Sequence, residues 1–478
     1  MKNLLSILSL MIFCHITIAQ NFIDTSYTIS TTQNVTYGSA INFAGQSVSL
    51  QMDISYPTDD VVADCGRPLV IIVHGGAWLA GNKNESYIPA LRQDFAKRGY
   101  VAVAINYRLG FFQSNVPKNC NIPNWNCMNA ADSAEWTRAL YRGIQDTRGA
   151  IRFMILNQEL YSIDAANVYV IGESAGAFIA MGVGFMDDES EKPLDCGTIA
   201  SVNAPHQNYY QPCIQGSVFD IPITQMNLTR PDLGSSSGTM NPTNLPYFVK
   251  GIGAFYGGMY EDLFSSKNSV YTPVLYMFHQ PNDLIVPIGH NKLLNGFNAC
   301  AIAVNCVNIQ DRRTVYGSAA INNMVDTLSI AAENKPQILY QTTNNNSDCL
   351  GQIANPSTGG HQLDNYWTRS TALATFFAPN IGTNDCLVLG ASDFEVWSTL
   401  VVFPNPNNGS FSISSSTELI GNVGIKIMDI SGKTHFDTWI DMESDGFSYH
   451  VALPSGIYFI EIVDTFSGKV YFGRVVVE

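Results

Sequence analysis

The chain has 478 residues, of which 46% are hydrophobic and 14% are charged, and this length is sufficient for one large globular unit and a smaller one. Its formal net charge of −15 opposes binding to the phosphate backbone of nucleic acids, and no basic cluster offsets that charge. These properties favour a globular enzyme or binding protein and exclude a nucleic-acid-binding protein.

The N-terminal residues predict a secretory signal peptide, residues 1–19. Lys2 supplies a positive charge, residues 4–13 form an apolar core, and the segment ends in the small residue Ala19. The apolar core is too short to span a bilayer, and no later segment has an apolar run of about 18 residues. We therefore expect cleavage after Ala19 and no integral membrane span.

A buried strand is predicted at residues 69–73, and the sequence His-Gly-Gly-Ala-Trp follows it directly. This pattern is typical of an oxyanion loop, in which backbone N–H groups bind the negative charge that develops on a reacting carbonyl. We expect the N–H groups of Gly75 and Gly76 to serve as donors. The alternative is an ordinary glycine turn in which His74 is a packing residue.

A second buried strand is predicted at residues 168–171, and Gly-Glu-Ser-Ala-Gly follows it at 172–176. This pentapeptide is the pattern of a nucleophile elbow, whose glycines are needed because the turn crowds the backbone. Ser174 is the predicted nucleophile. The apolar residues 177–181 predict a helix, and the N–H of Ala175 at its start would be a further oxyanion donor.

The acid is expected after the next buried strand, residues 274–278, because triad residues follow the order Ser, Asp or Glu, His in this arrangement. Asp283 lies in the following loop, where a carboxylate can orient an imidazole and stabilise its cation. The alternative for Asp283 is an Asx turn. Weaker candidates for the acid are Glu261, Asp262 and Asp326.

His361 is the predicted general base. It lies in the glycine-rich segment 357–362 just before a predicted helix at 366–377, so the loop can carry it over the sheet edge. Asp364 is expected to cap that helix. Among the other histidines, His279 and His290 are expected on the surface or in packing roles, and His435 and His450 lie in the C-terminal part.

Two long segments, 110–129 and 204–271, are predicted to shape the substrate pocket, because loops of this length usually bind or cover a ligand. Their aromatic residues can equally be core fillers. These residues include Phe111, Phe112, Trp125, Tyr209, Tyr210, Phe219, Tyr247, Phe255, Tyr256 and Tyr260.

The chain has 10 cysteines, and in an exported protein close pairs predict disulfides. Cys65 is left over by the spacing and can equally displace a member of another pair. No paired metal-ligand spacing is present, so neither a metal nor another cofactor is expected. The pairs are Cys120 with Cys127, Cys300 with Cys306, Cys196 with Cys213, and Cys349 with Cys386.

The C-terminal part is predicted to be a separate unit. Residues 20–380 are expected to form the catalytic domain, 381–398 a linker, and 399–478 a small all-β sandwich whose alternating strands are joined by Asn-Gly and Ser-Gly turns. The alternative for the last segment is an ordinary carbohydrate-binding or Ig-like accessory domain.

These motifs together resemble the α/β-hydrolases of the carboxylesterase and lipase superfamily over roughly residues 36–378. Segments 105–110 and 145–153 are similar to type-B carboxylesterases, which carry Glu as the acid, whereas the pattern Asn-Asp-x-x-Val-Pro at 282–287 is similar to smaller esterases that use Asp. The resemblance implies an α/β fold with a mostly parallel central sheet and helices on both faces.

Segments 402–411, 427–433, 453–459 and 469–477 are similar to the sorting domains of the type IX secretion system of Bacteroidetes. This resemblance implies that the type IX machinery is a partner and that it carries the chain across the outer membrane. The signal peptide would first carry the chain across the inner membrane. We therefore expect a secreted or cell-surface protein.

The sequence thus predicts a secreted serine hydrolase that cleaves carboxylic esters through an acyl-enzyme, with Ser174, His361 and Asp283 as its triad. The expected substrate is a small-molecule ester or an ester linked to a polysaccharide. The alternatives are a peptidase of the same fold and a non-catalytic adhesion or binding protein.

Overall fold

The computed structural model divides the chain into two compact units, residues 1–386 and 387–478, and each is described here by itself. The predicted signal peptide and most of the predicted linker lie outside the described residues. The structure describes residues 22–60, 62, 65–112, 133–202, 225–260, 263, 272–296, 313–327, 335–343, 360–382, 401–414, 421–429, 433–442, 446–450, 453–464 and 470–477.

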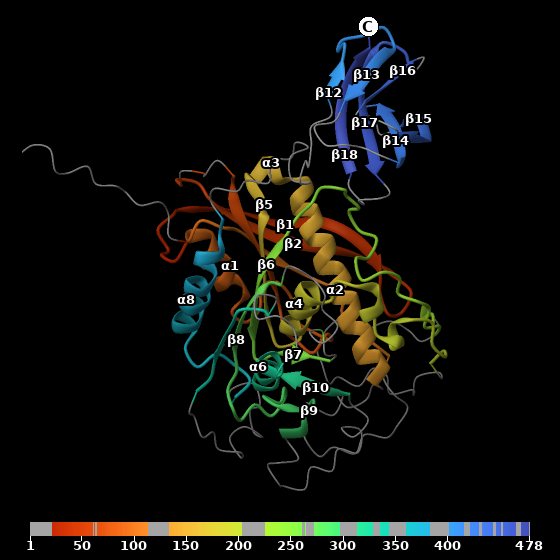
Figure 1. Ribbon diagram of the computed structural model, residues 1–478. Helices are drawn as coiled ribbons and strands as arrows, with labels where there is room; N and C mark the ends of the chain where they lie inside the picture. The colour runs from red at the N-terminus through yellow and green to blue at the C-terminus, as the bar shows by residue number, and fades with distance from the viewer. Residues whose placement is uncertain are drawn as a thin grey trace, which may run out of the picture. The chain divides into compact units, whose positions relative to one another are not determined.

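The first unit is built on an eight-stranded sheet (Figure 1). Strand β2 is antiparallel to β1 and β4, and the pairs from β4 to β11 are parallel. The order across the sheet is β1 (Ile29–Ile41), β2 (Ser47–Pro57), β4 (Val101–Ile105), β3 (Arg67–Val73), β5 (Ile163–Glu173), β6 (Val249–Phe255), β8 (Val274–Phe278) and β11 (Ile338–Gln341).

Helices cover both faces of this sheet (Figure 1). On one face α1 (Ile88–Lys97) and α8 (Tyr366–Phe377) pack into a core with side chains of the central strands. On the other face α4 (Ala175–Phe185) packs between the sheet and α2 (Ser133–Leu156), and Gly143 and Gly182 let these two helices approach closely. The expected α/β fold with a mostly parallel sheet is confirmed for this unit.

The central strands are apolar along their whole length because both of their faces are buried. Strands β3 and β4 expose almost no side-chain surface, which is the expected pattern for parallel strands that are covered by helices on both sides. The carboxyl ends of these strands meet at one edge of the sheet, where the loops that carry the predicted site residues also lie. None of the helices that the structure describes is both long and apolar enough to cross a membrane.

A small second sheet lies beyond the ends of the main strands. It has the order β7 (Gly258–Met259), β10 (Thr314–Gly317) and β9 (His290–Lys292), and α6 (Ser318–Thr327) begins directly after β10. The remaining short elements are α3 (Gln158–Tyr161) and the 3-10 turns η2 (Glu189–Glu191), η3 (Leu194–Cys196) and η8 (Ala378–Asn380).

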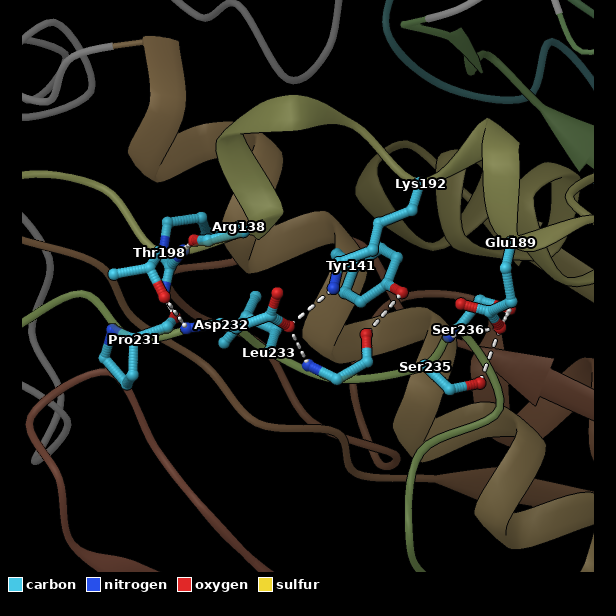
Figure 2. Close-up of polar contacts among 12 residues, drawn as sticks. Arg138, Tyr141, Glu189, Lys192, Thr198, Pro231, Asp232, Leu233, Ser235 and Ser236 are labelled. Atoms are coloured by element: carbon cyan, nitrogen blue, oxygen red, sulfur yellow. Dashed lines mark hydrogen bonds and ion pairs between the residues drawn. The ribbon is translucent and has the colours of Figure 1, made fainter.

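Part of the long segment 204–271 is fixed along helix α2 (Figure 2). Tyr141 donates to the carbonyl of Gly234 at 2.9 Å, and Gln145 donates to the carbonyls of Leu233 and Ser235 at 2.7 and 2.8 Å. Figure 2 also shows Arg138, Lys192 and Glu189 bound to the same stretch. Residues 231–236 are therefore a strap on the helix and are not themselves among the residues that line the pocket described below.

The second unit is all-β and consists of two antiparallel sheets. One sheet has β12 (Val401–Phe403), β13 (Ser410–Ser414) and β16 (Gly446–His450), and the other has β15 (Thr434–Met442), β14 (Gly421–Asp429), β17 (Gly456–Asp464) and β18 (Val470–Val477). Alternate residues of β14 and β17 are buried, which agrees with the period-2 pattern of the sequence. The buried residues include Ile425, Ile427, Ile460 and Ile462.

The cysteines differ from the predicted pairing at two described positions. Cys196 is a free thiol that is completely buried, so it does not pair with Cys213 as predicted. Cys65, which the spacing leaves over, is disulfide-bonded. The other cysteines named in the predicted pairs lie outside the described residues. The spacing failed here because pairing depends on which loops the fold brings together.

Candidate active site

Ser174 lies at the sharp turn between β5 and α4. Its backbone has φ 51° and ψ −121°, a left-handed conformation that is strained for a serine. A Cβ on Gly172 would lie 2.1 Å from the carbonyl oxygen of Gly176, and one on Gly176 would lie 2.2 Å from that of Val73. Both glycines of the pentapeptide are therefore required by close backbone contacts, and the turn places Ser174 at the carboxyl edge of the sheet.

The structure brings Ser174, His361 and Asp283 together. Nε2 of His361 lies 2.7 Å from Oγ of Ser174, and Nδ1 of His361 lies 2.7 Å from Oδ2 of Asp283. Since a carboxylate can only accept, Nδ1 donates to Asp283 and Nε2 accepts the hydrogen of the serine hydroxyl. This arrangement can activate a serine as a nucleophile.

Asp283 is held as a carboxylate by its surroundings. Its Oδ1 accepts hydrogen bonds from the backbone N–H groups of Ile285 and Val286 at 2.8 and 3.0 Å. Burial by itself would raise the pKa of Asp283, but the charge of His361 and the hydrogen bonds from His279 and His361 outweigh burial and lower that pKa. Asp283 is therefore ionised at neutral pH and can stabilise a cationic His361.

The competing candidates lie elsewhere. Asp326 is exposed on α6, and Asp364 pairs with Arg369 at 2.7 Å. The expected capping role of Asp364 is wrong, since the side chain of Asn365 accepts from the N–H of Thr368 at the start of α8. Glu261 and Asp262 lie outside the described residues.

The other histidines fall into different surroundings. His279 is completely buried, as expected for a packing residue, but its ring also contacts the carboxylate of Asp283. His290 is exposed in β9 and stacks on Tyr316, with ring centroids 4.0 Å apart. His435 pairs with Asp429 in the second unit. His279 and Asp283 are four positions apart in one loop, and the conformation of that loop, which the sequence did not indicate, turns the two side chains together.

The loop after β3 turns sharply beside Ser174, as an oxyanion loop requires, and the structure adds one candidate donor to those predicted. The carboxylate of Glu173 interacts with the N–H of Gly75, and the role of Gly75 as an oxyanion donor stays a prediction. The N–H groups of Gly76, Ala77 and Ala175 have no hydrogen-bond acceptor among the residues that the structure describes. Ala77 is thus a candidate donor that the sequence reasoning missed.

Gly76 is needed for the turn of this loop. Its φ is +105°, and a Cβ at this position would lie 2.0 Å from the carbonyl oxygen of Ala80. The N–H of Leu79 donates to the carbonyl of Gly76 at 2.9 Å and closes the turn. Trp78 is 2% exposed and packs edge-on against Trp136 and Phe178, so the loop is anchored in the core.

His74 supports the loop from within the core. Its Nδ1 donates to the carbonyl of Gly75 at 2.7 Å, and its ring stacks on Tyr107 with centroids 4.4 Å apart. Burial lowers the pKa of His74 to about 4, although the hydrogen bond to Gly75 opposes this shift. His74 is therefore neutral at physiological pH and is a packing residue, as the alternative interpretation of this motif expected.

Glu173 connects three loops next to the nucleophile. Its carboxylate accepts from the hydroxyl groups of Ser86 and Tyr256 at 3.0 and 2.7 Å, and it also interacts with the N–H of Gly75. Burial raises the pKa of Glu173 because the hydrogen bonds and the charge of His361 only partly compensate for desolvation. The ring of Tyr256 in turn packs edge-on against His361, with centroids 4.8 Å apart.

The hydrolase unit has a pocket of about 870 Å³ whose lining includes none of Ser174, His361 and Asp283. Tyr260 is part of its lining and also packs against Trp78 and Phe178, with ring centroids 6.0 and 5.6 Å apart. By contrast, Phe111 and Phe112 are buried at 0 and 2% exposure, so the expectation that they line the pocket is wrong. The lining also includes Glu191, Lys192, His290, Arg313 and Tyr316.

Two families match parts of the chain. Residues 52–121 and 133–228 match the family described as BD-FAE, and residues 401–478 match the family described as a secretion system C-terminal sorting domain.

In the part of the chain that the structure describes, no group of three or more His, Cys, Asp or Glu side chains is placed to hold a metal ion.

Two curated relatives align with about a quarter of the chain. The neuroligin-like protein glit-1 of Caenorhabditis elegans is 32% identical over 128 residues, which are 27% of this chain and 15% of that protein. A probable isoprenylcysteine alpha-carbonyl methylesterase of Oryza sativa subsp. japonica is 27% identical over 136 residues, or 28% and 25% of the two chains. The chain therefore spans a quarter or less of these relatives.

Two solved structures of esterases align over most of the chain. Esterase 2 of Thermogutta terrifontis is 15% identical, and the alignment covers 75% of this chain and 96% of that one with a TM-score of 0.34. Esterase B of Lactobacillus rhamnosis is 13% identical, with 74 and 87% coverage and a TM-score of 0.35.

Proposed function

We propose that this chain, an α/β-hydrolase of esterase type with a C-terminal sorting domain, hydrolyses carboxylic esters with Ser174 as its nucleophile. The observation that carries the proposal is the pair of 2.7 Å contacts that link Ser174 to His361 and His361 to Asp283. Three side chains from loops far apart in the sequence rarely form this alignment without a catalytic role.

The first step forms an acyl-enzyme. Nε2 of His361 takes the proton of the Ser174 hydroxyl as the oxygen attacks the ester carbonyl, and Asp283 stabilises the resulting imidazolium. The carbonyl oxygen becomes an oxyanion. We assign the N–H groups of Gly76, Ala77 and Ala175 to it as donors, because none of them has an acceptor among the described residues, and Gly75 stays a predicted donor.

The second half of the reaction releases the product. The imidazolium of His361 gives its proton to the leaving alcohol, and the acyl group stays on Ser174 as an ester. Water then attacks this ester while His361 again acts as the base and takes a proton from the water. The carboxylic acid departs, and His361 returns the proton to the oxygen of Ser174. No cofactor takes part in these steps.

The residues that line the pocket favour an ester substrate with a polar group. The pocket contains the stacked rings of His290 and Tyr316 together with the charged side chains of Glu191 and Arg313. Stacked rings and charged groups suit a hydroxylated group such as a sugar better than a long alkyl chain. We infer that the substrate is a small or polysaccharide-linked ester whose polar part enters this pocket.

The second unit directs export. The match to the secretion sorting domain indicates passage through the type IX system to the cell surface or the outside. We infer that its two antiparallel sheets pack on one another as a small sandwich that the secretion machinery recognises. We also infer that residues 1–19 are the signal peptide and that residues 20–380 form the catalytic domain.

The test is hydrolysis of p-nitrophenyl esters of increasing chain length by the wild type, S174A and S237A. Ser237 is exposed, so S237A is a matched control and should keep full activity. S174A should lose on the order of 10⁶-fold in kcat. Cleavage of peptide anilides but not of esters would favour a peptidase. Hydrolysis of neither by the folded wild type would favour a binding protein. Either result would overturn the proposal.

A further inference from the structure

We propose that His279 is a positioning residue of this active site, whose ring holds the carboxylate of Asp283 on the side opposite His361. The inference rests on the proposed triad. It assigns a function to a buried histidine that neither attacks the substrate nor takes the proton of the nucleophile. Its contribution acts through the alignment of Asp283 with His361.

His279 is the first residue after β8 and is 0% exposed. Its Nε2 lies 3.0 Å from Oδ2 of Asp283 and 3.0 Å from the carbonyl oxygen of Val286. Its Nδ1 lies 3.0 Å from Oγ of Ser318 at the start of α6. The backbone N–H of His279 donates to the carbonyl of Gln341, which fixes the residue to the neighbouring strand β11.

These contacts determine which nitrogen carries the hydrogen. Nε2 faces a carboxylate oxygen and a carbonyl oxygen, and both of these can only accept. Nε2 of His279 must therefore be the donor to these oxygens, while Nδ1 and the hydroxyl of Ser318 are hydrogen-bonded to each other. Both ring nitrogens of His279 then have protein partners, as a fully buried polar group requires.

The same contacts leave Asp283 little freedom to rotate. Its Oδ1 accepts two backbone N–H groups, and its Oδ2 accepts from Nδ1 of His361 at 2.7 Å and from Nε2 of His279 at 3.0 Å. A continuous row of hydrogen bonds thus runs from Ser174 through His361, Asp283 and His279 to Ser318. Without the His279 donor, Oδ2 would be held only by the side chain that it has to orient.

The expected loss follows from the geometry that the reaction needs. A misplacement of about 1 Å near a catalytic group can lower the rate by about 10²-fold, even when the group itself is kept. Loss of the hydrogen bond from His279 also removes one of the interactions that lower the pKa of Asp283. A role that is only structural would instead lower stability and leave the rate per folded molecule unchanged.

Three substitutions of His279 separate the donor from the packing. In H279Q the side-chain amide can place an N–H near the position of Nε2, so the bond to Asp283 is kept. In H279L the volume is similar but the donor is absent, and in H279N the amide is too short to reach Asp283. H435L, in the second unit, is a matched histidine control outside the hydrolase unit.

The experiment uses the full chain and two readouts: kcat and KM for p-nitrophenyl butyrate, and the rate at which a fluorophosphonate labels Ser174. Both are normalised to titrated active sites, and thermal unfolding is recorded. We expect H279L to lose about 10²-fold in kcat and in labelling rate with KM within twofold, and H279Q to stay within about tenfold of wild type. H435L should match the wild type.

Wild-type kcat and labelling rate in H279L would overturn the inference, as would an H279Q variant as slow as H279L. H279N takes the place of H279L if the leucine variant does not fold. The labelling rate keeps the inference separate from the proposed function, because it measures the reactivity of Ser174 without turnover. Labelling without ester turnover would refute the esterase and still test His279, whereas a wild type that is not labelled at Ser174 would refute both.

Discussion

Acid should destabilise the hydrolase unit through His74, the buried histidine of the oxyanion loop. In the folded protein burial lowers the pKa of His74 to about 4, while in the unfolded chain it should be near the ordinary 6.5. Below pH 6.5 the unfolded chain therefore binds a proton that the folded chain does not accept until about pH 4. The stability that neutral His74 allows is complete above pH 6.5 and is lost as the pH falls to 4.

The size of this effect follows from the two pKa values. Each pH unit between them is worth about 1.4 kcal/mol, so the interval from 6.5 to about 4 corresponds to a loss of about 3 kcal/mol. No reduction for solvent screening applies, because the ring is 1% exposed. A loss of this size is a substantial part of the stability of an ordinary domain.

The variant H74N isolates the contribution. Its side-chain amide can still donate to the carbonyl of Gly75 but cannot take up a proton, although the stacking on Tyr107 is lost. Urea unfolding of both proteins from pH 7.5 to 4, followed by tryptophan fluorescence, gives the free energy of unfolding of each. The advantage of the wild type over H74N should shrink by about 3 kcal/mol on acidification. A difference that does not depend on pH, or one that grows in acid, would refute the reasoning.

Three further predictions concern the site and the second unit. D283N should lower kcat by about 10⁴-fold, as expected when the imidazole is no longer held in the required tautomer, and the exposed D326N should not; KM should change little in either variant. G76A should lose at least about 10²-fold in kcat and unfold at a lower temperature, because the Cβ of the alanine would lie 2.0 Å from the carbonyl oxygen of Ala80. Unchanged kinetics would contradict this account of the loop. Deletion of residues 401–478 should leave the protein inside the cell envelope with full esterase activity, which fractionation and ester hydrolysis measure together; export of the truncated chain would contradict the sorting function.

Much of the fold and the site could be predicted because the determining signals are local. The apolar runs before His74 and Ser174 are strands buried on both faces, and the glycines around Ser174 are required by contacts within a few residues. The order of the motifs was sufficient to select Asp283 and His361, and the structure places both within hydrogen-bond distance of one another. Their catalytic roles remain predictions that the variants above test.

The remaining errors arise where distant segments meet. Gly75 and Gly76 are equivalent in the sequence, and only the folded structure brings the carboxylate of Glu173 close to the N–H of Gly75. His279 resembled a packing residue because its partner Ser318 lies 39 positions away. The strap at 231–236 looked like a loop for binding substrate, since the side chains of α2 that hold it are remote in sequence.

The most direct test of the account is detection of the acyl group on the nucleophile. Wild type and S174A would be mixed with p-nitrophenyl butyrate, quenched with acid during turnover, digested and examined by mass spectrometry. The account predicts a butyryl group on the peptide that contains Ser174 in the wild type, and none on that peptide in S174A. Turnover by the wild type without an acyl group on Ser174, or equal turnover by S174A, would contradict it.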